Sequence, residues 1–192
     1  MSIIPITERL WPAIYDLQCQ VYSEIEPETM EVLRSKWLHS PHACFAYCSN
    51  QTENADSPLS SSAPIQAYLL AHELAGAEAP KLHQPLSSTH TAASGSKSKQ
   101  GSAIRLFLHD LAVSKDVKGM GVGKLMVAHL IALATAKGYK EVLLIAIQGS
   151  VPFWQKQGFE LDLEVSELQA AAIEASYGAG AKAMRKKLSF NR

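Results

Sequence analysis

The sequence predicts a mixed α/β fold, and three observations support this. Segments with apolar residues at helical spacing alternate along the chain with short apolar runs of strand length. One such run, residues 142–147, is continuously apolar, as expected of a strand covered on both faces. Residues 104–113 read as a longer strand, and a glycine-rich turn and an amphipathic helix follow it. The expected architecture is a mixed sheet with a central βαβα core flanked by helices.

The first third of the chain predicts two helices and then two strands. Residues 9–22 and 28–38 carry apolar side chains every three or four positions, which is typical of helices with one buried face. Residues 43–48 and 65–71 are short apolar runs that contain aromatic residues, which favours strands.

After residue 104, strands and helices alternate. Gly138 is suited to cap the helix before it, and Pro152 suits the first turn of a short helix. Ser166 and Gln169 form a potential capping box at the start of another helix. The expected order is strand 104–113, helix 121–137, strand 142–147, helix 151–157, strand 159–165, helix 166–176 and strand 182–188.

Two Ser-rich stretches, residues 49–64 and 84–103, interrupt this pattern. They contain few large apolar side chains and cannot bury enough surface to offset their ordering entropy, so mobile surface loops are expected. The piece between them is too short to fold alone. We therefore expect residues 1–192 to form a single domain.

Composition excludes several classes of protein. The 192 residues are 47% hydrophobic, and 18 Lys plus Arg balance 18 Asp plus Glu. Zero net charge argues against nucleic acid as the main partner, since phosphate neutralisation supplies most of that affinity. No apolar run is long enough to span a membrane, and the first residues do not resemble a signal peptide. Three cysteines without metal-site spacing favour free thiols, no metal and a cytoplasmic location.

The glycine-rich turn predicts an anion site. Glycines at the start of a helix let backbone N–H groups approach a phosphate. A Walker loop would need glycine where Lys118 stands, and both dinucleotide fingerprints fail as well, at Lys124 and Met126. The pattern basic-x-x-Gly-x-Gly fits through Lys118, Gly121 and Gly123. From the glycines alone, a structural turn without a ligand remains about equally plausible.

The surrounding residues resemble the GCN5-related N-acetyltransferase (GNAT) superfamily. Leu111-Ala112-Val113 stands before the turn, and Phe153-Trp154 followed by Gly158-Phe159 stands one helix and one strand after it. Within that superfamily, the segments 108–113 and 151–159 look like those of aralkylamine (serotonin-type) N-acetyltransferases. The resemblance implies the GNAT fold, with a mixed and mostly antiparallel sheet, and acetyl-CoA as co-substrate.

The resemblance also implies residues that bind the cofactor. Main-chain groups of the strand would pair with the pantetheine arm, the turn would hold the pyrophosphate, and an aromatic pair would complete the site. The residues concerned are Leu111, Ala112, Val113, Lys118, Gly119, Met120, Gly121, Val122, Gly123, Lys124, Phe153 and Trp154.

His109 is the candidate base, because an alkylamine must lose a proton before it can attack a thioester. The family resemblance implies a proton-relay histidine at this position, and a packed core histidine is the alternative. Strand alternation would place His109 on one face with Phe107, Leu111 and Val113, and Asp110 on the opposite face in a structural role.

The acid that protonates the leaving thiolate is less clear. Related enzymes commonly have a tyrosine after the phenylalanine, whereas this chain has Trp154, whose indole does not titrate usefully. Tyr177 is a candidate replacement, with a surface loop tyrosine as the alternative.

The acceptor side of the site is predicted from Phe107 and from an acidic run that starts at Glu24. The run continues with Glu26, Glu28 and Glu31 and would suit a cationic amine, although a solvated helix start explains it equally well.

The sequence therefore predicts direct acetyl transfer from acetyl-CoA to a small primary amine by a monomer or homodimer. Acetylation of protein N-termini or lysines, and a non-catalytic acyl-CoA-binding module, are the alternatives.

Overall fold

The computed structural model describes residues 2–23, 26–48, 64–74, 76, 78–86 and 105–189. Seven strands form one sheet in the order β1-β2-β3-β4-β5-β7-β6, and every neighbouring pair is antiparallel except β4 with β5. The predicted mixed, mostly antiparallel α/β sheet is confirmed. The predicted loops at 49–64 and 84–103 lie almost entirely outside the described residues.

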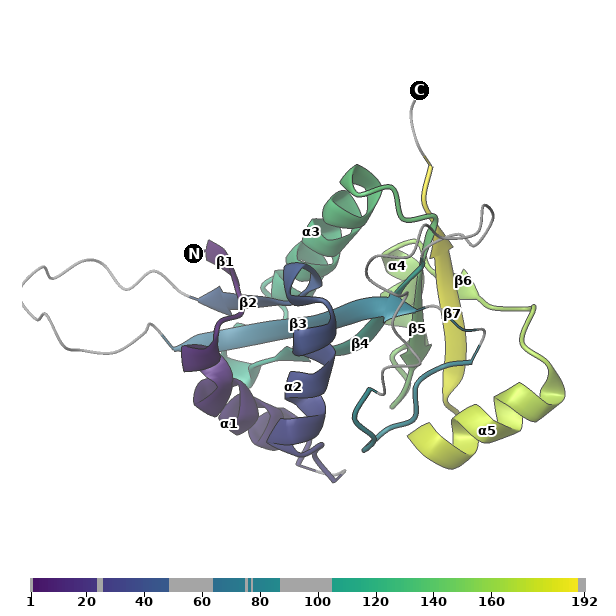
Figure 1. The fold of residues 1–192 in the computed structure, drawn as a ribbon, viewed down its shortest axis with the longest axis horizontal. Helices are drawn as coiled ribbons and strands as arrows, with labels where there is room; N and C mark the ends of the chain where they lie inside the picture. Colours follow the sequence, from purple (N-terminus) through teal and green to yellow (C-terminus); the bar gives the residue numbers. More distant parts are fainter. Residues whose placement is uncertain are drawn as a thin grey trace, which may run out of the picture.

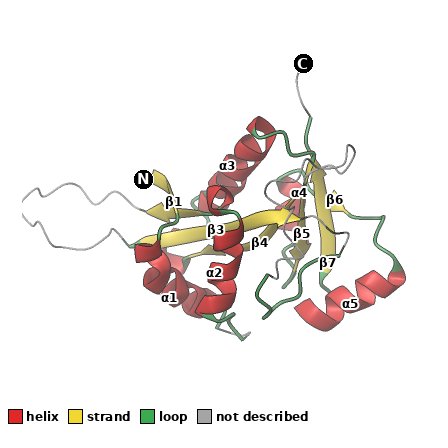
Figure 2. Cartoon of the chain, in the orientation of Figure 1, coloured by secondary structure: helices red, strands yellow, loops and turns green. Residues whose placement is uncertain are grey.

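The elements follow one another along the chain as shown in Figures 1 and 2. The strands are β1 (Ser2–Pro5), β2 (Phe45–Cys48), β3 (Ile65–Leu74), β4 (Arg105–Val113), β5 (Glu141–Ala146), β6 (Glu160–Leu161) and β7 (Lys182–Lys187). The α-helices are α1 (Trp11–Val21), α2 (Met30–His39), α3 (Val122–Ala136), α4 (Val151–Lys156) and α5 (Glu167–Tyr177). Each predicted helix is present within about two residues of its expected bounds.

Two hydrophobic clusters cover the two faces of the sheet. One packs α3 and α4 against β4 and β5 through residues such as Met126, Leu130 and Leu144. The other packs α1 and α2 through Trp11, Ile14 and Leu33 against Tyr68 and other residues of the opposite face. Figure 1 shows α1 and α2 side by side, with α3 apart from them.

The largest differences from the prediction concern two strands. The first, β1, was not predicted; it is four residues long and pairs only with β2. The predicted strand 159–165 is reduced to Glu160–Leu161, because Asp162 then accepts a hydrogen bond from the Glu164 N–H and turns the chain. Leu163 is consequently 87% exposed, so the apolar alternation in this segment does not reflect burial.

Among the described residues, no helix is long and apolar enough to cross a membrane.

Candidate functional site

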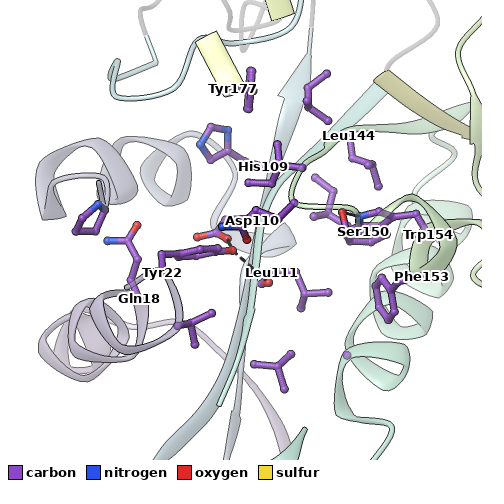
Figure 3. Close-up of a pocket in the computed structure, with 18 of the residues that line it drawn as sticks. Gln18, Tyr22, His109, Asp110, Leu111, Leu144, Ser150, Phe153, Trp154 and Tyr177 are labelled. Atoms are coloured by element: carbon purple, nitrogen blue, oxygen red, sulfur yellow. Dashed lines mark hydrogen bonds between the residues drawn. The ribbon is translucent and has the colours of Figure 1, made fainter. Parts of the chain in front are cut away.

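The central parallel strands separate partway along the sheet. Only four residues of β4, Arg105 to Leu108, pair with β5. Beyond them β4 continues to Val113, still paired with β3 on its other side. Past Leu108, β4 has no described strand paired on its β5 side, and a cavity of about 820 Å³ opens there. Figure 3 shows side chains from α1, β4, β5 and α4 around this opening.

One end of the cavity is lined by the glycine-rich turn. Gly121 has φ +82° and is the N-cap of α3, so the turn requires a residue that tolerates the left-handed region. The first N–H groups of α3 have no carbonyl partner within the helix, and Lys118 and Lys124 add positive charge beside them. A Cβ at Gly123 would lie 3.4 Å from the Phe153 ring, so this glycine allows α3 to pack closely on α4.

Most predicted cofactor residues border this cavity. They are Leu111, Val113, Lys118, Gly119, Gly121, Val122, Gly123, Lys124, Phe153 and Trp154. Two predicted residues lie elsewhere. Ala112 is fully buried in the cluster on the α1–α2 face, and Met120 is 64% exposed. Their main chains remain part of β4 and of the turn.

His109 lies at an irregularity of β4. Leu70 pairs with Asp110 whereas Ala71 pairs with Leu108, so His109 is an extra residue between two paired ones. Leu111 and Val113 pack on the α3 side, whereas His109 reaches Glu28 and Asp110 reaches Tyr22. The prediction that His109 shares a face with Leu111 and Val113 is wrong, as is the prediction that Asp110 lies opposite His109. The bulge turns both side chains to the same side.

The imidazole of His109 is 1% exposed and makes one polar contact through Nε2, which lies 2.9 Å from Glu28 Oε2. Its other nitrogen, Nδ1, is buried and has no hydrogen-bond partner among the described residues. His109 also lines the cavity. Nδ1 is thus the ring nitrogen with a free hydrogen-bonding position, and it lies buried beside the opening.

Glu28 is buried rather than solvated, which corrects the expectation of a solvated helix start for this member of the acidic run. Its carboxylate also accepts hydrogen bonds from the buried Lys36 ammonium at 3.2 Å and from the His83 N–H at 2.8 Å. Burial alone would raise the pKa of Glu28, but His109, Lys36 and His83 outweigh it and lower the pKa to about 2. Glu31 and Glu26 are exposed, and Glu24 lies outside the described residues.

Asp110 is held by two phenols. The hydroxyls of Tyr22 and Tyr68 each donate to one of its carboxylate oxygens at 2.5 Å. Burial raises the pKa of Asp110, although both hydroxyl groups act in the opposite direction. The predicted structural role of Asp110 fits this arrangement, and the same contacts bring Tyr22 of α1 to the edge of the cavity (Figure 3).

The aromatic residues near the leaving-group position are tied to neighbours. The Trp154 indole N–H donates to Ser150 Oγ at 3.1 Å, and both residues line the cavity. Because the indole proton is directed at Ser150, the Ser150 hydroxyl proton is free to point elsewhere. Tyr177, the last residue of α5, borders the cavity, but its hydroxyl donates to the Pro80 carbonyl, and burial raises its pKa.

Phe107 lies beside His109, with ring centroids 6.0 Å apart, and lines a second cavity of about 360 Å³ under α5. No cluster of three potential metal ligands occurs in the part of the chain that the structure describes. Sequence reasoning missed Lys36 and Ser150, which carry no motif, and it assigned Glu28 no contact with His109.

Comparisons with known proteins agree with this geometry. Residues 89–159 match the Acetyltransferase (GNAT) family. The matched segment contains β4, the glycine-rich turn, α3, β5 and α4. No curated protein matches the sequence.

Solved structures with this GNAT fold match nearly the whole chain. They include the GphF GNAT-like decarboxylase in complex with isobutyryl-CoA, at 14% identity and a TM-score of 0.66, covering 98% of this chain and 100% of that one. The NatC complex bound to Gag peptide and CoA matches at 14% identity and a TM-score of 0.62, covering 98% of this chain and 100% of that one. The ribosomal-protein-S18-alanine N-acetyltransferase from Escherichia coli matches at 13% identity and a TM-score of 0.58, covering 100% of this chain and 96% of that one. These matches do not confirm the narrower likeness to aralkylamine N-acetyltransferases.

Proposed function

We propose that this GNAT-fold chain transfers acetyl from acetyl-CoA directly to the nitrogen of a primary amine, and that the acceptor is a small molecule. One observation carries the proposal. A single cavity is lined both by the glycine-rich start of α3 and by His109, whose buried Nδ1 has no hydrogen-bond partner among the described residues.

The cofactor half of the proposal rests on the split between β4 and β5. The turn at Gly121 would hold the pyrophosphate with backbone N–H groups, and Lys118 and Lys124 would neutralise its charge. The unpaired edge of β4 offers main-chain groups to an extended amide-containing chain, in the manner of an added strand. A bound acetyl-CoA supplies the activated thioester.

The chemistry requires a base, and we assign this role to His109. Nδ1 would take a proton from the acceptor ammonium, directly or through water. The free amine then attacks the thioester carbonyl carbon, the C–N bond forms, and the C–S bond breaks. The departing sulfur gains a proton from solvent, and the Ser150 hydroxyl is a candidate to relay it, donating its own proton to the sulfur as it accepts one from water, because the indole N–H of Trp154 is already engaged.

The acceptor half of the cavity suits a cation. Glu26 and Asp110 line it together with Glu28. Carboxylates would favour the ammonium form of an incoming amine. A protein N-terminus is a second candidate acceptor, because the NatC structure of similar fold is bound to a peptide and CoA.

The test is the release of free thiol from acetyl-CoA across a panel of amines and short peptides. We expect turnover with at least one primary amine, and a rate that falls by about 10²–10⁴ in the His109→Gln variant. Coenzyme A affinity should stay the same in that variant, since His109 lies away from the turn. Preference for peptides would identify the second candidate. Tight coenzyme A binding without thiol release from any acceptor would instead indicate a binding module.

A further inference from the structure

The unpartnered Nδ1 of His109 raises the question of how one nitrogen of this ring stays free. A neutral imidazole carries one N–H and one lone pair, and either nitrogen can hold the proton. Nε2 faces a carboxylate oxygen of Glu28 at 2.9 Å. A carboxylate only accepts hydrogen bonds, so this contact favours the proton on Nε2 and leaves the lone pair on Nδ1.

Glu28 is itself fixed in place from several directions. Its Oε1 accepts from the His83 N–H and from the Lys36 ammonium, and its main-chain carbonyl accepts from Gln18 Nε2 at 2.8 Å. Lys36 is fully buried and also donates to the Gln84 carbonyl. The carboxylate therefore cannot follow a moving imidazole without breaking its bonds to Lys36 of α2 and to the His83 N–H.

Among the described groups near the ring, no other carboxylate can accept a hydrogen bond from His109 in place of Glu28. Asp110 is the nearest alternative on β4, but both of its oxygens already accept tyrosine hydroxyls. His72 of β3 packs 6.0 Å away, centroid to centroid, and burial lowers its pKa well below the usual value. The titratable and charged groups that surround His109 are Glu28, Lys36, His72, Asp110 and the lining residues Tyr22, Glu26, His83 and Tyr177.

We propose that Glu28 is a positioning residue for His109: it holds the tautomer with the proton on Nε2, so that Nδ1 is the atom that accepts the proton of the amine. The expected effect on the reaction rate rests on the proposed function, whereas the tautomer of His109 does not depend on it. When Nδ1 takes a proton, the imidazolium and the carboxylate form an ion pair, and the proton returns to solvent before the next turnover. Lys36 balances the carboxylate while the ring is neutral.

The tautomer can be measured without an acceptor. In a protein labelled with ¹⁵N-histidine, the His109 ring signals are assigned by their loss in His109→Gln, which distinguishes them from those of the other six of the seven histidines. We expect a protonated Nε2 and an unprotonated Nδ1 at neutral pH, and loss of this preference in Glu28→Gln. A ring protonated on Nδ1 in the wild-type protein would overturn the proposal.

Kinetics supply the second readout. Loss of the Glu28 charge removes a group that stabilises the imidazolium ion by direct contact at 2.9 Å. The acidic limb of the pH–rate profile should then move to lower pH in Glu28→Gln. The plateau rate should drop by at least about tenfold, and by no more than the ~10²–10⁴ expected for loss of the base itself. Glu31→Gln removes an exposed carboxylate of the first turn of α2 and serves as the matched control, with less than about a twofold change.

The outcomes separate the two proposals. An unchanged pH profile and rate in Glu28→Gln, together with a large loss in His109→Gln, would overturn the role of Glu28 and leave the function intact. An unchanged rate in His109→Gln would overturn the assigned base instead. If Glu28→Gln does not fold because Lys36 is left buried without a counter-charge, the double variant Glu28→Gln, Lys36→Met removes both charges and is measured in the same way.

Discussion

Replacing Gly121 with alanine tests whether the start of α3 holds the cofactor or only turns the chain. Gly138, just after α3, provides a matched control. Both glycines have φ +82°, and a Cβ built at either one meets no atom within 4 Å. The backbone strain of the two substitutions should therefore be similar. Only Gly121 lines the cavity.

The expected cost in stability follows from the backbone angle. Placing a Cβ in the left-handed region costs about 1–2 kcal/mol. At about 2–4 °C per kcal/mol for a chain of this size, each variant should melt about 2–8 °C below the wild-type protein. Equal losses for the two variants would show that strain is the shared cause.

The expected cost in binding should differ between the two variants. A methyl group on Gly121 stands where the backbone would approach a pyrophosphate, so coenzyme A affinity should fall at least about tenfold, or about 1.4 kcal/mol. At a concentration near 100 Kd, coenzyme A should stabilise the wild-type protein and Gly138→Ala by about 2.7 kcal/mol, and Gly121→Ala by about half as much. Calorimetry measures Kd directly. Equal affinity in all three proteins would refute the assignment of the turn.

Two further predictions concern the acceptor half of the site. Because the pKa of Glu28 is about 2 in the folded protein and about 4.5 in the unfolded chain, its contribution to stability is complete above about pH 4.5 and is lost as the pH falls towards 2. The loss should reach about 3 kcal/mol in denaturant titrations and should be absent in Glu28→Gln, whereas a similar acid dependence in that variant would assign it to other carboxylates. Ser150→Ala should lower kcat by about tenfold with little change in coenzyme A affinity if its hydroxyl protonates the thiolate, and an unchanged kcat would exclude that role.

The cofactor half of the site could be predicted from the sequence because its parts are local. The β4 strand, the turn and the first residues of α3 follow one another without a break, so their spacing in sequence fixes their spacing in space. Gly121 and Gly123 could be identified from their spacing to Lys118 alone. The structure adds that Gly121 has a left-handed backbone and that Gly123 lies close to the Phe153 ring. The extended backbone of Ala112 could likewise be predicted without knowledge of tertiary contacts, because Ala112 belongs to the same strand.

The acceptor half could not be predicted, for physical reasons that particular residues illustrate. His109 and Glu28 are 81 positions apart, and no periodicity connects them. A bulge depends on the register with the neighbouring strand, which a single strand sequence does not contain, so the face of His109 was wrongly predicted. Lys36 occupies a helix position where a lysine normally reaches solvent, yet here Glu28 and Gln84 accept its hydrogen bonds in the interior.

The buried charges around Glu28 serve both the fold and the proposed chemistry. Glu28 bonds to Gln18 of α1, to Lys36 of α2, to the segment at His83 and to His109 of β4. A hydrophobic residue at Lys36 would avoid the cost of burying an ammonium, which lowers the pKa of that lysine despite its partner. It would also leave the carboxylate with one donor fewer and freer to rotate. A rigid, ionised Glu28 requires such a counter-charge, so the arrangement that is unfavourable for burial is the one that directs Nε2 of His109 to Glu28 and leaves Nδ1 without a hydrogen bond to the described residues.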